Sequence, residues 1–247
     1  ALMEHMNAGH QLDMREVEKY ESKMFVAKKA YNDWKSRPNT TLLKQVNGIW
    51  FPEQDTFFQD GIAILGFQKA VNFAKQRRIA LDIGAHCGFV TRFLSDKFQK
   101  VVAFEPNHQS FLCLARNTAT LNNVSAHEIA LGGGRGEVLM GYDNTRYGNT
   151  GCYMVDKPGE VVRMTTLDSY GLEEVDFIKI DVEGYELDVL KGGTKTIENN
   201  KPVIMMEVKE GMSEQYGVHY KEASKFLEYF GYRQVAEERL DRIFLHD

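Results

Sequence analysis

Cysteine and proline are scarce in this chain, and their scarcity limits what the protein can be. The 247 residues include three cysteines and five prolines, with no Cys-x-x-Cys pair and no Pro-Pro pair. Cys87, Cys113 and Cys152 are scattered and odd in number, which fits a reducing setting better than a disulfide framework. We therefore expect a cytoplasmic protein whose thiols stay reduced.

The chain also lacks a long apolar run and an excess of positive charge. No stretch has the length of a membrane span or the pattern of a signal peptide, so we expect no membrane span. Lys and Arg total 30 against 35 Asp and Glu, which gives a formal net charge of −5. Because a nucleic-acid partner favours a basic face, this balance argues against one.

Two regions are expected along the chain, an N-terminal tail with a helical extension over 1–45 and one α/β domain over 46–247. Apolar side chains recur at spacings of three and four over 12–35, which predicts a helix. That helix docks on the domain, covers the substrate or joins two copies, so a homodimer is one expectation. The aromatic-rich stretch 46–58 predicts a hairpin or two short strands.

Strands and helices then alternate. Strands are expected at 79–83, 100–104, 124–130, 175–180 and 202–208, and helices at 61–77, 89–98, 108–121, 184–199 and 220–230. Strand runs such as "IALDI" are nearly all apolar, which is typical of strands buried on both faces. Turn-rich hairpins are expected over 132–159, and a last hairpin at 232–237 and 241–246. The pattern predicts a mostly parallel sheet with helices on both faces.

A glycine turn, "DIGAHCG", follows the expected strand over 79–83. Gly84 permits positive φ and close backbone approach, and Gly88 lets the next helix pack near a ligand. Ligands of open parallel sheets bind at this end of the strands. The spacing is G-x-x-x-G, so the glycine that admits a pyrophosphate in G-x-G-x-x-G is missing. The turn therefore indicates a ligand without a pyrophosphate, or only a tight connection.

Carboxylates stand at the ends of three expected strands. Glu105 ends the strand after the glycine turn, where a carboxylate can accept hydrogen bonds from both hydroxyls of a ribose. Asp181 and Glu183 follow the strand over 175–180, and Glu207 ends the strand over 202–208. Glu183 and Glu186 also suit the first turn of a helix, where acids interact favourably with the helix dipole.

These segments together resemble the FkbM family of S-adenosylmethionine-dependent methyltransferases. The matching stretches are "LDIGAHCGFVTRFLS", "VVAFEPNHQSFLCLARNTATLNNV", "TTLDSY", "DFIKIDVEGYELDVLKGG" and "KPVIMMEV". They cover roughly residues 46–210. The resemblance implies a Rossmann-like class I methyltransferase fold, an α/β fold with a mostly parallel seven-stranded sheet and a C-terminal antiparallel hairpin. It also implies S-adenosyl-L-methionine as cofactor.

The resemblance implies methyl transfer to a hydroxyl of a sugar, glycan or natural product. The expected cofactor-binding residues are Asp82, Gly84, Ala85, His86, Gly88, Glu105, Pro106, Asn107, Ala130 and Asp181. His86 stands where the family usually carries Asn, which indicates either a changed contact to the cofactor or a catalytic role. A hydroxyl acceptor needs a base in hydrogen-bond reach, and the candidates are Asp181, His86 and Glu207.

The acceptor is expected to be a small molecule or a carbohydrate. The expected substrate-binding residues are Trp50, Asp55, Arg146, Asn149 and Glu183, although hairpin packing and ordinary loop polarity explain them as well. No metal site is assigned, but Asp181 and Glu207 could instead hold a divalent ion, since oxygen ligands suit Mg²⁺.

Three other functions are weighed. A nucleic-acid methyltransferase is disfavoured because its usual Pro-Pro-aromatic loop and Pro-Cys nucleophile are both missing. An NAD-dependent oxidoreductase is disfavoured by the missing second glycine. A non-catalytic protein that binds the cofactor in the same fold would be recognised by binding without turnover.

Overall fold

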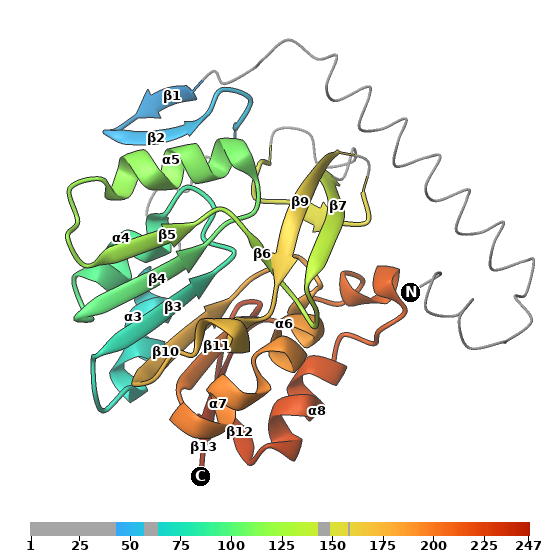
Figure 1. The fold of residues 1–247 in the computed structure, drawn as a ribbon. Helices are drawn as coiled ribbons and strands as arrows, with labels where there is room; N and C mark the ends of the chain where they lie inside the picture. The colour runs from blue at the N-terminus through green and yellow to red at the C-terminus, as the bar shows by residue number, and fades with distance from the viewer. Residues whose placement is uncertain (1–42, 57–63, 143–148, 158) are drawn as a thin grey trace, which may run out of the picture.

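A seven-stranded sheet lies at the centre of the computed structural model, which describes residues 43–56, 64–142, 149–157 and 159–247 (Figure 1). Its spatial order is β12 (Tyr232–Glu238), β13 (Asp241–His246), β11 (Val203–Glu207), β10 (Val175–Ile180), β3 (Ile79–Ile83), β4 (Lys100–Phe104) and β5 (Val124–His127). The five strands from β11 to β5 are parallel, and β13 is antiparallel to both of its neighbours. The predicted seven-stranded fold with a C-terminal antiparallel hairpin is confirmed. The helix predicted over 12–35 lies outside the described residues.

Helices cover both faces of this sheet. They are α3 (Ile64–Phe73), α4 (Phe89–Ser95), α5 (His108–Thr118), α6 (Glu186–Gly192), α7 (Thr194–Asn200) and α8 (Glu222–Tyr229), with short 3₁₀ turns η1 (Leu167–Tyr170) and η2 (Ser213–Tyr216). The sheet packs on α3 and α4 through one apolar cluster and on α6, α7 and α8 through another. Within the described ranges, no helix combines the length and apolar character needed to cross a bilayer.

The two-sided burial explains the continuous apolar runs of the sequence. Along β11, Val203 and Met205 pack with α3 and α4, whereas Ile204 and Met206 pack with α6 and α8. Successive side chains of a strand point to opposite faces, so a strand covered on both sides needs apolar residues at every position. The acidic residues at the strand ends, Glu105, Asp181 and Glu207, are therefore not explained by packing within the sheet.

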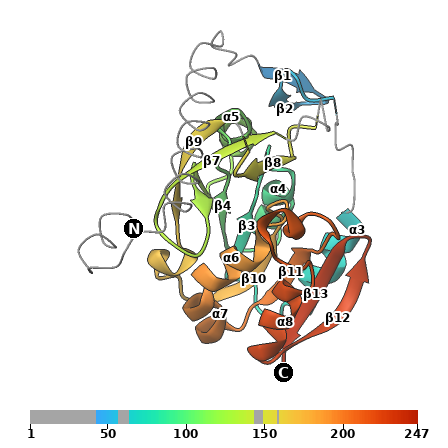
Figure 2. The same ribbon diagram turned by 90° about the vertical axis from the view of Figure 1, so that its right-hand side faces the viewer.

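A smaller four-stranded sheet stands beside the carboxyl ends of the large sheet (Figure 2). It contains β6 (Ala130–Leu131), β9 (Glu160–Thr165), β7 (Gly136–Tyr142) and β8 (Tyr153–Val155), in that order. The strand predicted over 124–130 was wrong in extent. Its first part stays in the large sheet as β5, whereas Ala130 and Leu131 pair with β9 in the small one.

A hairpin of β1 (Leu43–Val46) and β2 (Ile49–Pro52) packs on α5. The sequence predicts a hairpin over 46–58, but the observed one begins earlier and ends at Pro52. Asn117 of α5 fastens it, because its side-chain amide accepts from the Trp50 backbone N–H at 2.8 Å and donates to the Trp50 carbonyl at 2.9 Å. The hairpin thereby holds the following loop, which includes Asp55, against the main domain.

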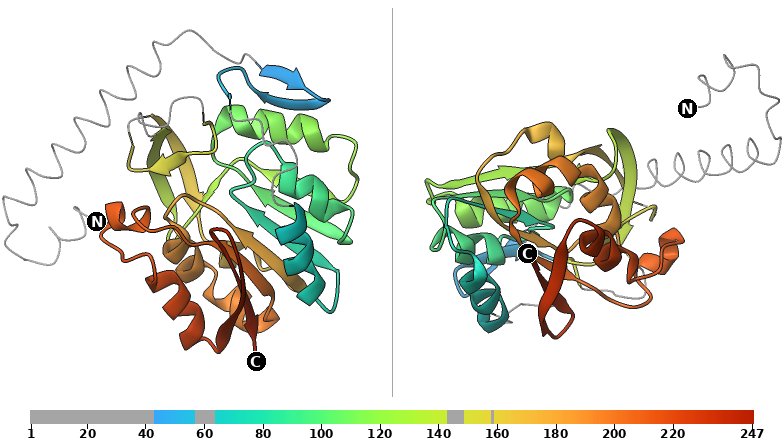
Figure 3. Two further views of the ribbon diagram at one scale, coloured as in Figure 1. Left: turned by 180° about the vertical axis from the view of Figure 1, so that it is seen from behind. Right: turned by 90° about the horizontal axis from the view of Figure 1, so that it is seen from below.

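The C-terminal hairpin lies beside α3 when the molecule is seen from behind (Figure 3). Lys69 of α3 forms an ion pair with Glu238 of β12, and Gly66 leaves room for the same glutamate. The turn between β12 and β13 is thus fixed next to the carboxyl end of β11. This contact sets one rim of the cavity described below.

Candidate active site

A cavity of about 340 Å³ opens over the carboxyl ends of the parallel strands. Four adjacent strands contribute one lining residue or loop each, namely Glu105 after β4, Gly84 after β3, Asp181 after β10 and Glu207 at the end of β11. The small sheet supplies another wall through residues such as Ala130 and Tyr153. The volume falls in the range of small-molecule sites.

Glu105 is the buried carboxylate of this cavity, with 5% of its surface exposed. Its Oε2 accepts from the His86 backbone N–H and its Oε1 from the Asn107 backbone N–H, each at 2.8 Å. Burial raises the pKa of Glu105 to about 7, against those two hydrogen bonds. An ionised carboxylate offers about four acceptor positions, so both oxygens can still accept from a ligand's hydroxyls.

Lys179 is a buried cation beneath the glycine turn. Its Nζ donates to the Gly84 carbonyl at 2.8 Å and lies 3.6 Å from Asp82 Oδ1 and 3.5 Å from Asp181 Oδ2. Burial alone would lower the pKa of Lys179, but Asp181 and Asp82 raise it above its ordinary value. The lysine therefore stays charged and ties the β3 loop to the β10 loop.

Acidic side chains gather on the other side of the cavity. Carboxylate oxygens of Asp181, Glu183 and Glu207 lie within 4.8 Å of one another. Burial, reinforced by Asp181 and Glu183, raises the pKa of Glu207 to about 8. Burial and Asp181 also raise the pKa of Asp241 to about 6. Ionised carboxylates at this distance repel one another, and either a retained proton or a divalent cation could reduce that repulsion.

His86 also lines the cavity. Its backbone is in the left-handed region, with φ of 48°, which is uncommon for a residue other than glycine. Burial lowers the pKa of His86, opposed by the charge of Asp55. The ring is therefore neutral near pH 7 and can accept a proton.

Most residues predicted for the site line this cavity. They are Gly84, Ala85, His86, Glu105, Pro106, Ala130, Asn149, Asp181, Glu183 and Glu207. Arg146 lies outside the described residues. Five others are placed beyond the lining, namely Trp50, Asp55, Asp82, Gly88 and Asn107.

Those five have structural partners instead. Asn107 caps α5 by accepting from the Ser110 N–H at 2.9 Å. The Arg116 guanidinium lies over the Trp50 ring, with its Cζ 5.1 Å from the centre of that ring. Gly88 allows Leu114 of α5 to approach, since an added Cβ would lie 2.7 Å from its Cδ1. Asp82 accepts from the Thr91 hydroxyl at 2.6 Å. Asp55 Oδ2 lies 3.8 Å from His86 Nε2.

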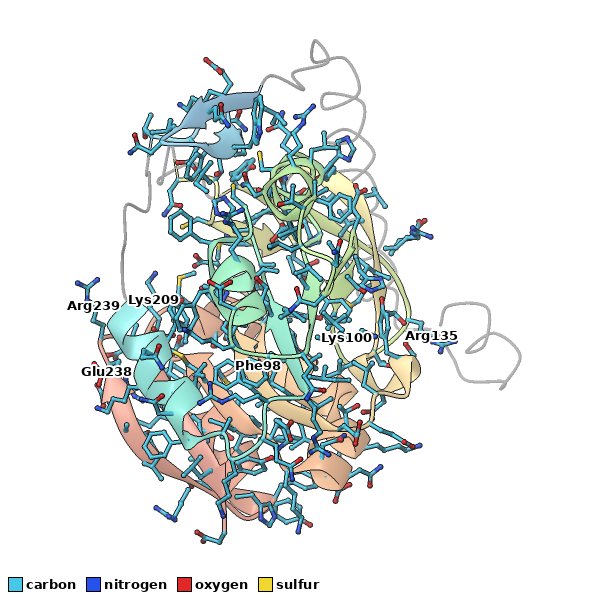
Figure 4. The ribbon with its side chains drawn as sticks, turned by 90° about the vertical axis from the view of Figure 1, so that its left-hand side faces the viewer. Phe98, Lys100, Arg135, Lys209, Glu238 and Arg239 are labelled. Carbon is cyan, nitrogen blue, oxygen red and sulfur yellow. The ribbon has the colours of Figure 1, made fainter. Side chains whose placement is uncertain are left out.

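The cavity reaches the molecular surface beside α3. Lys209, which follows β11, and Arg239, in the turn between β12 and β13, line this rim. Their side chains lie on the same side of the molecule as Glu238 (Figure 4). Two cationic side chains thus stand at this rim, close in the chain to the acidic side chains of Glu207 and Asp241.

Comparison with known families decides the classification of this site. The profile of the Methyltransferase FkbM domain matches residues 82–234, more than half of the chain. The chain belongs to the FkbM methyltransferase family. Its matched domain is an S-adenosylmethionine-dependent methyltransferase domain, as the motifs at Glu105 and Asp181 indicated.

Curated relatives of this FkbM domain are distant. "Methyltransferase 1" of Beauveria bassiana is 28% identical over 142 residues, 45% of this chain and 57% of that protein. "Hexuronic acid methyltransferase AglP" of Haloferax volcanii is 26% identical over 169 residues, 66% of this chain and 67% of that protein. The chain thus spans little more than half the length of the Beauveria protein.

Among solved structures, an FkbM methyltransferase from Methylobacillus flagellatus KT is 19% identical, with a TM-score of 0.47. The alignment covers 76% of this chain and 46% of that chain. Family membership therefore rests on the profile match.

The residues of this FkbM site fit the cofactor that its family uses. A nucleoside carries vicinal ribose hydroxyls, and Glu105 presents an oriented carboxylate within a cavity of suitable size. Gly84, Ala85 and Ala130 contribute walls without bulky side chains.

Sequence reasoning missed Lys179 and Thr150. Lys179 carries a recognisable signal, because it is a charged residue between two isoleucines of a strand and stands two residues before Asp181. Thr150 gives no such signal, since it stands in a turn-rich stretch and its importance depends on contacts with residues far away in the sequence.

Proposed function

We propose that this protein transfers a methyl group from S-adenosylmethionine to a hydroxyl of a sugar, glycan or natural-product acceptor. The observation that carries the proposal is the sharing of one cavity by Glu105, suited to ribose hydroxyls, and by three candidate bases, His86, Asp181 and Glu207. A cavity with both kinds of group serves transfer to an acceptor that loses a proton.

A carbohydrate acceptor is supported by the name of one relative. The Haloferax protein is called a hexuronic acid methyltransferase, and its similarity covers two thirds of both chains. The cationic rim formed by Lys209 and Arg239 is compatible with an acidic sugar. A small-molecule acceptor and a cytoplasmic site of action belong to the same proposal.

Glu105 would hold the ribose hydroxyls, and the Gly84–Ala85 turn would face the amino-acid end of the cofactor. When bound, the cofactor supplies an electrophilic methyl group on a sulfonium. The protein's own contribution is to orient the acceptor, exclude water and remove the hydroxyl proton. Asp181 Oδ2 lies 3.5 Å from Lys179 Nζ, and this ion pair suits an orienting role of the carboxylate toward the acceptor.

Calorimetric titration with S-adenosylmethionine and S-adenosylhomocysteine, with and without Mg²⁺, tests the first part. We expect micromolar binding of both compounds that is independent of Mg²⁺, followed by methylation of members of a panel of sugars and uronic acids. No binding to the folded protein would contradict the cofactor assignment. A requirement for Mg²⁺ would assign the acidic cluster to a metal.

The variant Asp181→Asn tests the acceptor side. We expect a loss of turnover larger than the loss of cofactor affinity, since the carboxylate is proposed to act on the acceptor. Glu128→Asn, an exposed acid, serves as control. Equal losses in turnover and affinity would limit Asp181 to holding the cofactor or the fold.

A further inference from the structure

A hydrogen-bonded chain leads from a buried aspartate to the imidazole of His86. Thr150 Oγ1 donates to Asp55 Oδ2, and His86 Nε2 lies 2.8 Å from Thr150 Oγ1. Asp55 is 0% exposed and Thr150 2%, so bulk water does not compete for these contacts. His86 Nε2 lies 3.8 Å from Asp55 Oδ2, so the aspartate also acts on the ring through space.

Counting hydrogens along this chain fixes the tautomer of the imidazole. A threonine hydroxyl has one hydrogen, and a carboxylate can only accept. Because the Thr150 hydrogen goes to Asp55, the Thr150 oxygen must accept from His86. His86 therefore carries its proton on Nε2, which leaves the lone pair of a neutral ring on Nδ1. Among the described residues, no hydrogen bond engages Nδ1.

The loop with Asp55 is fastened independently of the cavity. Lys44 Nζ donates to the Asp55 carbonyl at 2.5 Å and to the Glu53 carbonyl at 2.7 Å. The Asp55 backbone N–H donates to the Pro52 carbonyl at 3.0 Å. Asp55 also precedes the residues matched by the family profile, 82–234. The loop after the β1–β2 hairpin thus places the Asp55 carboxylate next to His86, although Asp55 lies outside the residues that the family profile matches.

We propose that Asp55 and Thr150 are positioning residues that hold His86 in its Nε2–H tautomer, so that Nδ1 serves as the general base of the transfer. The inference rests on the proposed function. The acceptor hydroxyl gives its proton to Nδ1 while its oxygen bonds to the methyl carbon and the carbon–sulfur bond breaks. The sulfonium becomes a neutral thioether, and the new imidazolium charge is stabilised by Asp55.

The other candidate bases are less suited near neutral pH. The raised pKa of Glu207, about 8, leaves that carboxyl mostly protonated. Asp181 Oδ2 lies 3.5 Å from the Lys179 ammonium and is therefore engaged in an ion pair. Burial lowers the pKa of His86, the charge of Asp55 opposes that shift, and Lys179 and Asp181 have smaller, opposite effects. The Cys87 Sγ lies 3.6 Å from Nε2.

The tautomer can be measured without cofactor or acceptor. Histidine labelled with a nitrogen isotope gives separate imidazole shifts for protonated and bare nitrogens, assigned through His86→Gln. We expect His86 to carry hydrogen on Nε2 at pH 8. In Asp55→Asn, the amide can donate to Thr150, so the Thr150 hydrogen turns toward the ring and the proton moves to Nδ1. An Nδ1–H tautomer in the unaltered protein would overturn the proposal.

Kinetics supply the second arm. We expect Asp55→Asn and Thr150→Val to lower kcat by about 100-fold or more while cofactor Kd changes by less than about threefold. Thr150→Ser keeps the hydroxyl and should restore most of the rate lost in Thr150→Val. An unchanged kcat and pH profile in Asp55→Asn would overturn the positioning role. If no hydroxyl acceptor is methylated although the tautomer is as expected, the proposed function fails while the hydrogen-bonded chain stands.

Discussion

A Cβ atom at Gly84 would lie 1.8 Å from the backbone oxygen of Asp181. The turn after β3 and the turn after β10 therefore touch backbone to backbone, with φ of Gly84 at 77°. The loop after β3 carries His86, which contacts Glu105, and the loop after β10 carries Asp181 and Glu183. The contact at Gly84 holds these two loops together at one edge of the sheet. The requirement for glycine here is steric as well as conformational.

Gly84→Ala tests this contact. We expect a loss of at least about 3 kcal/mol in the free energy of unfolding, because strain at positive φ and a backbone collision combine. That corresponds to a fall in Tm of roughly 6–12 °C for a domain of this size. Gly134→Ala is the control, because nothing lies within 4 Å of a Cβ there. Similar thermal unfolding of both variants would contradict the interpretation.

Glu105→Gln tests the cofactor side. The amide group cannot accept from both backbone N–H groups and a ribose, so we expect affinity to fall about 30-fold, or about 2 kcal/mol. Glu128→Gln should leave the calorimetric Kd unchanged.

The raised pKa of Glu105, about 7, predicts a pH dependence of binding. The ionised form accepts hydrogen bonds better, so the affinity for the cofactor should rise by up to about tenfold per pH unit as pH increases toward 7. Above pH 7 the affinity should level off. Titrations between pH 5 and pH 8 measure this. A flat profile in the unaltered protein would show that ribose hydroxyls do not bind this carboxylate.

Lys179→Met tests the buried cation. Its removal leaves Asp82 and Asp181 without the ammonium group between them, and we expect a loss of about 3–5 kcal/mol in the free energy of unfolding. Lys195→Met, at an exposed position, is the matched control. Denaturant unfolding of a double variant, Asp82→Asn with Lys179→Met, should recover part of the loss, because one unpaired acid is removed. No recovery would mean that Lys179 acts through packing alone.

Glu207→Gln should stabilise the protein at alkaline pH. The pKa of Glu207 is about 8 in the folded chain, above its ordinary value of 4.5, so folding favours the protonated form. Stability is therefore full below pH 4.5 and is lost as pH rises through 8, and glutamine removes that loss. We expect a gain of about 2–4 kcal/mol at pH 9 and little difference near pH 4. Urea unfolding at both pH values measures it, and equal effects at both would contradict it.

The fold and part of the site could be predicted because their signals are local. Apolar runs gave the strands, and polar residues at the ends of those runs gave Glu105, Asp181 and Glu207. Parallel strands bring such ends to one edge, so their common cavity followed from chain order. The break between β5 and β6 could not be seen, because pairing with β9 depends on a strand some 30 residues later.

Asn107 and Trp50 show where a sequence pattern is ambiguous. An asparagine after a strand end suits a ligand and suits a helix cap equally, and the structure uses it as the cap of α5. An aromatic residue in a hairpin suits sugar stacking and suits packing equally, and Trp50 packs beside Arg116. Long-range partners decide both cases, and no local pattern records them.

The position of β13 has a consequence for how this protein is made. β13 follows β12 in the chain but lies between β11 and β12 in the sheet. When a ribosome has delivered β12, that strand has no neighbour to join, and Glu207 lies on an uncovered edge of the growing sheet. The acidic half of the cavity therefore completes only after Asp241 has emerged, so a stalled or shortened product would expose β11 to pairing with other chains.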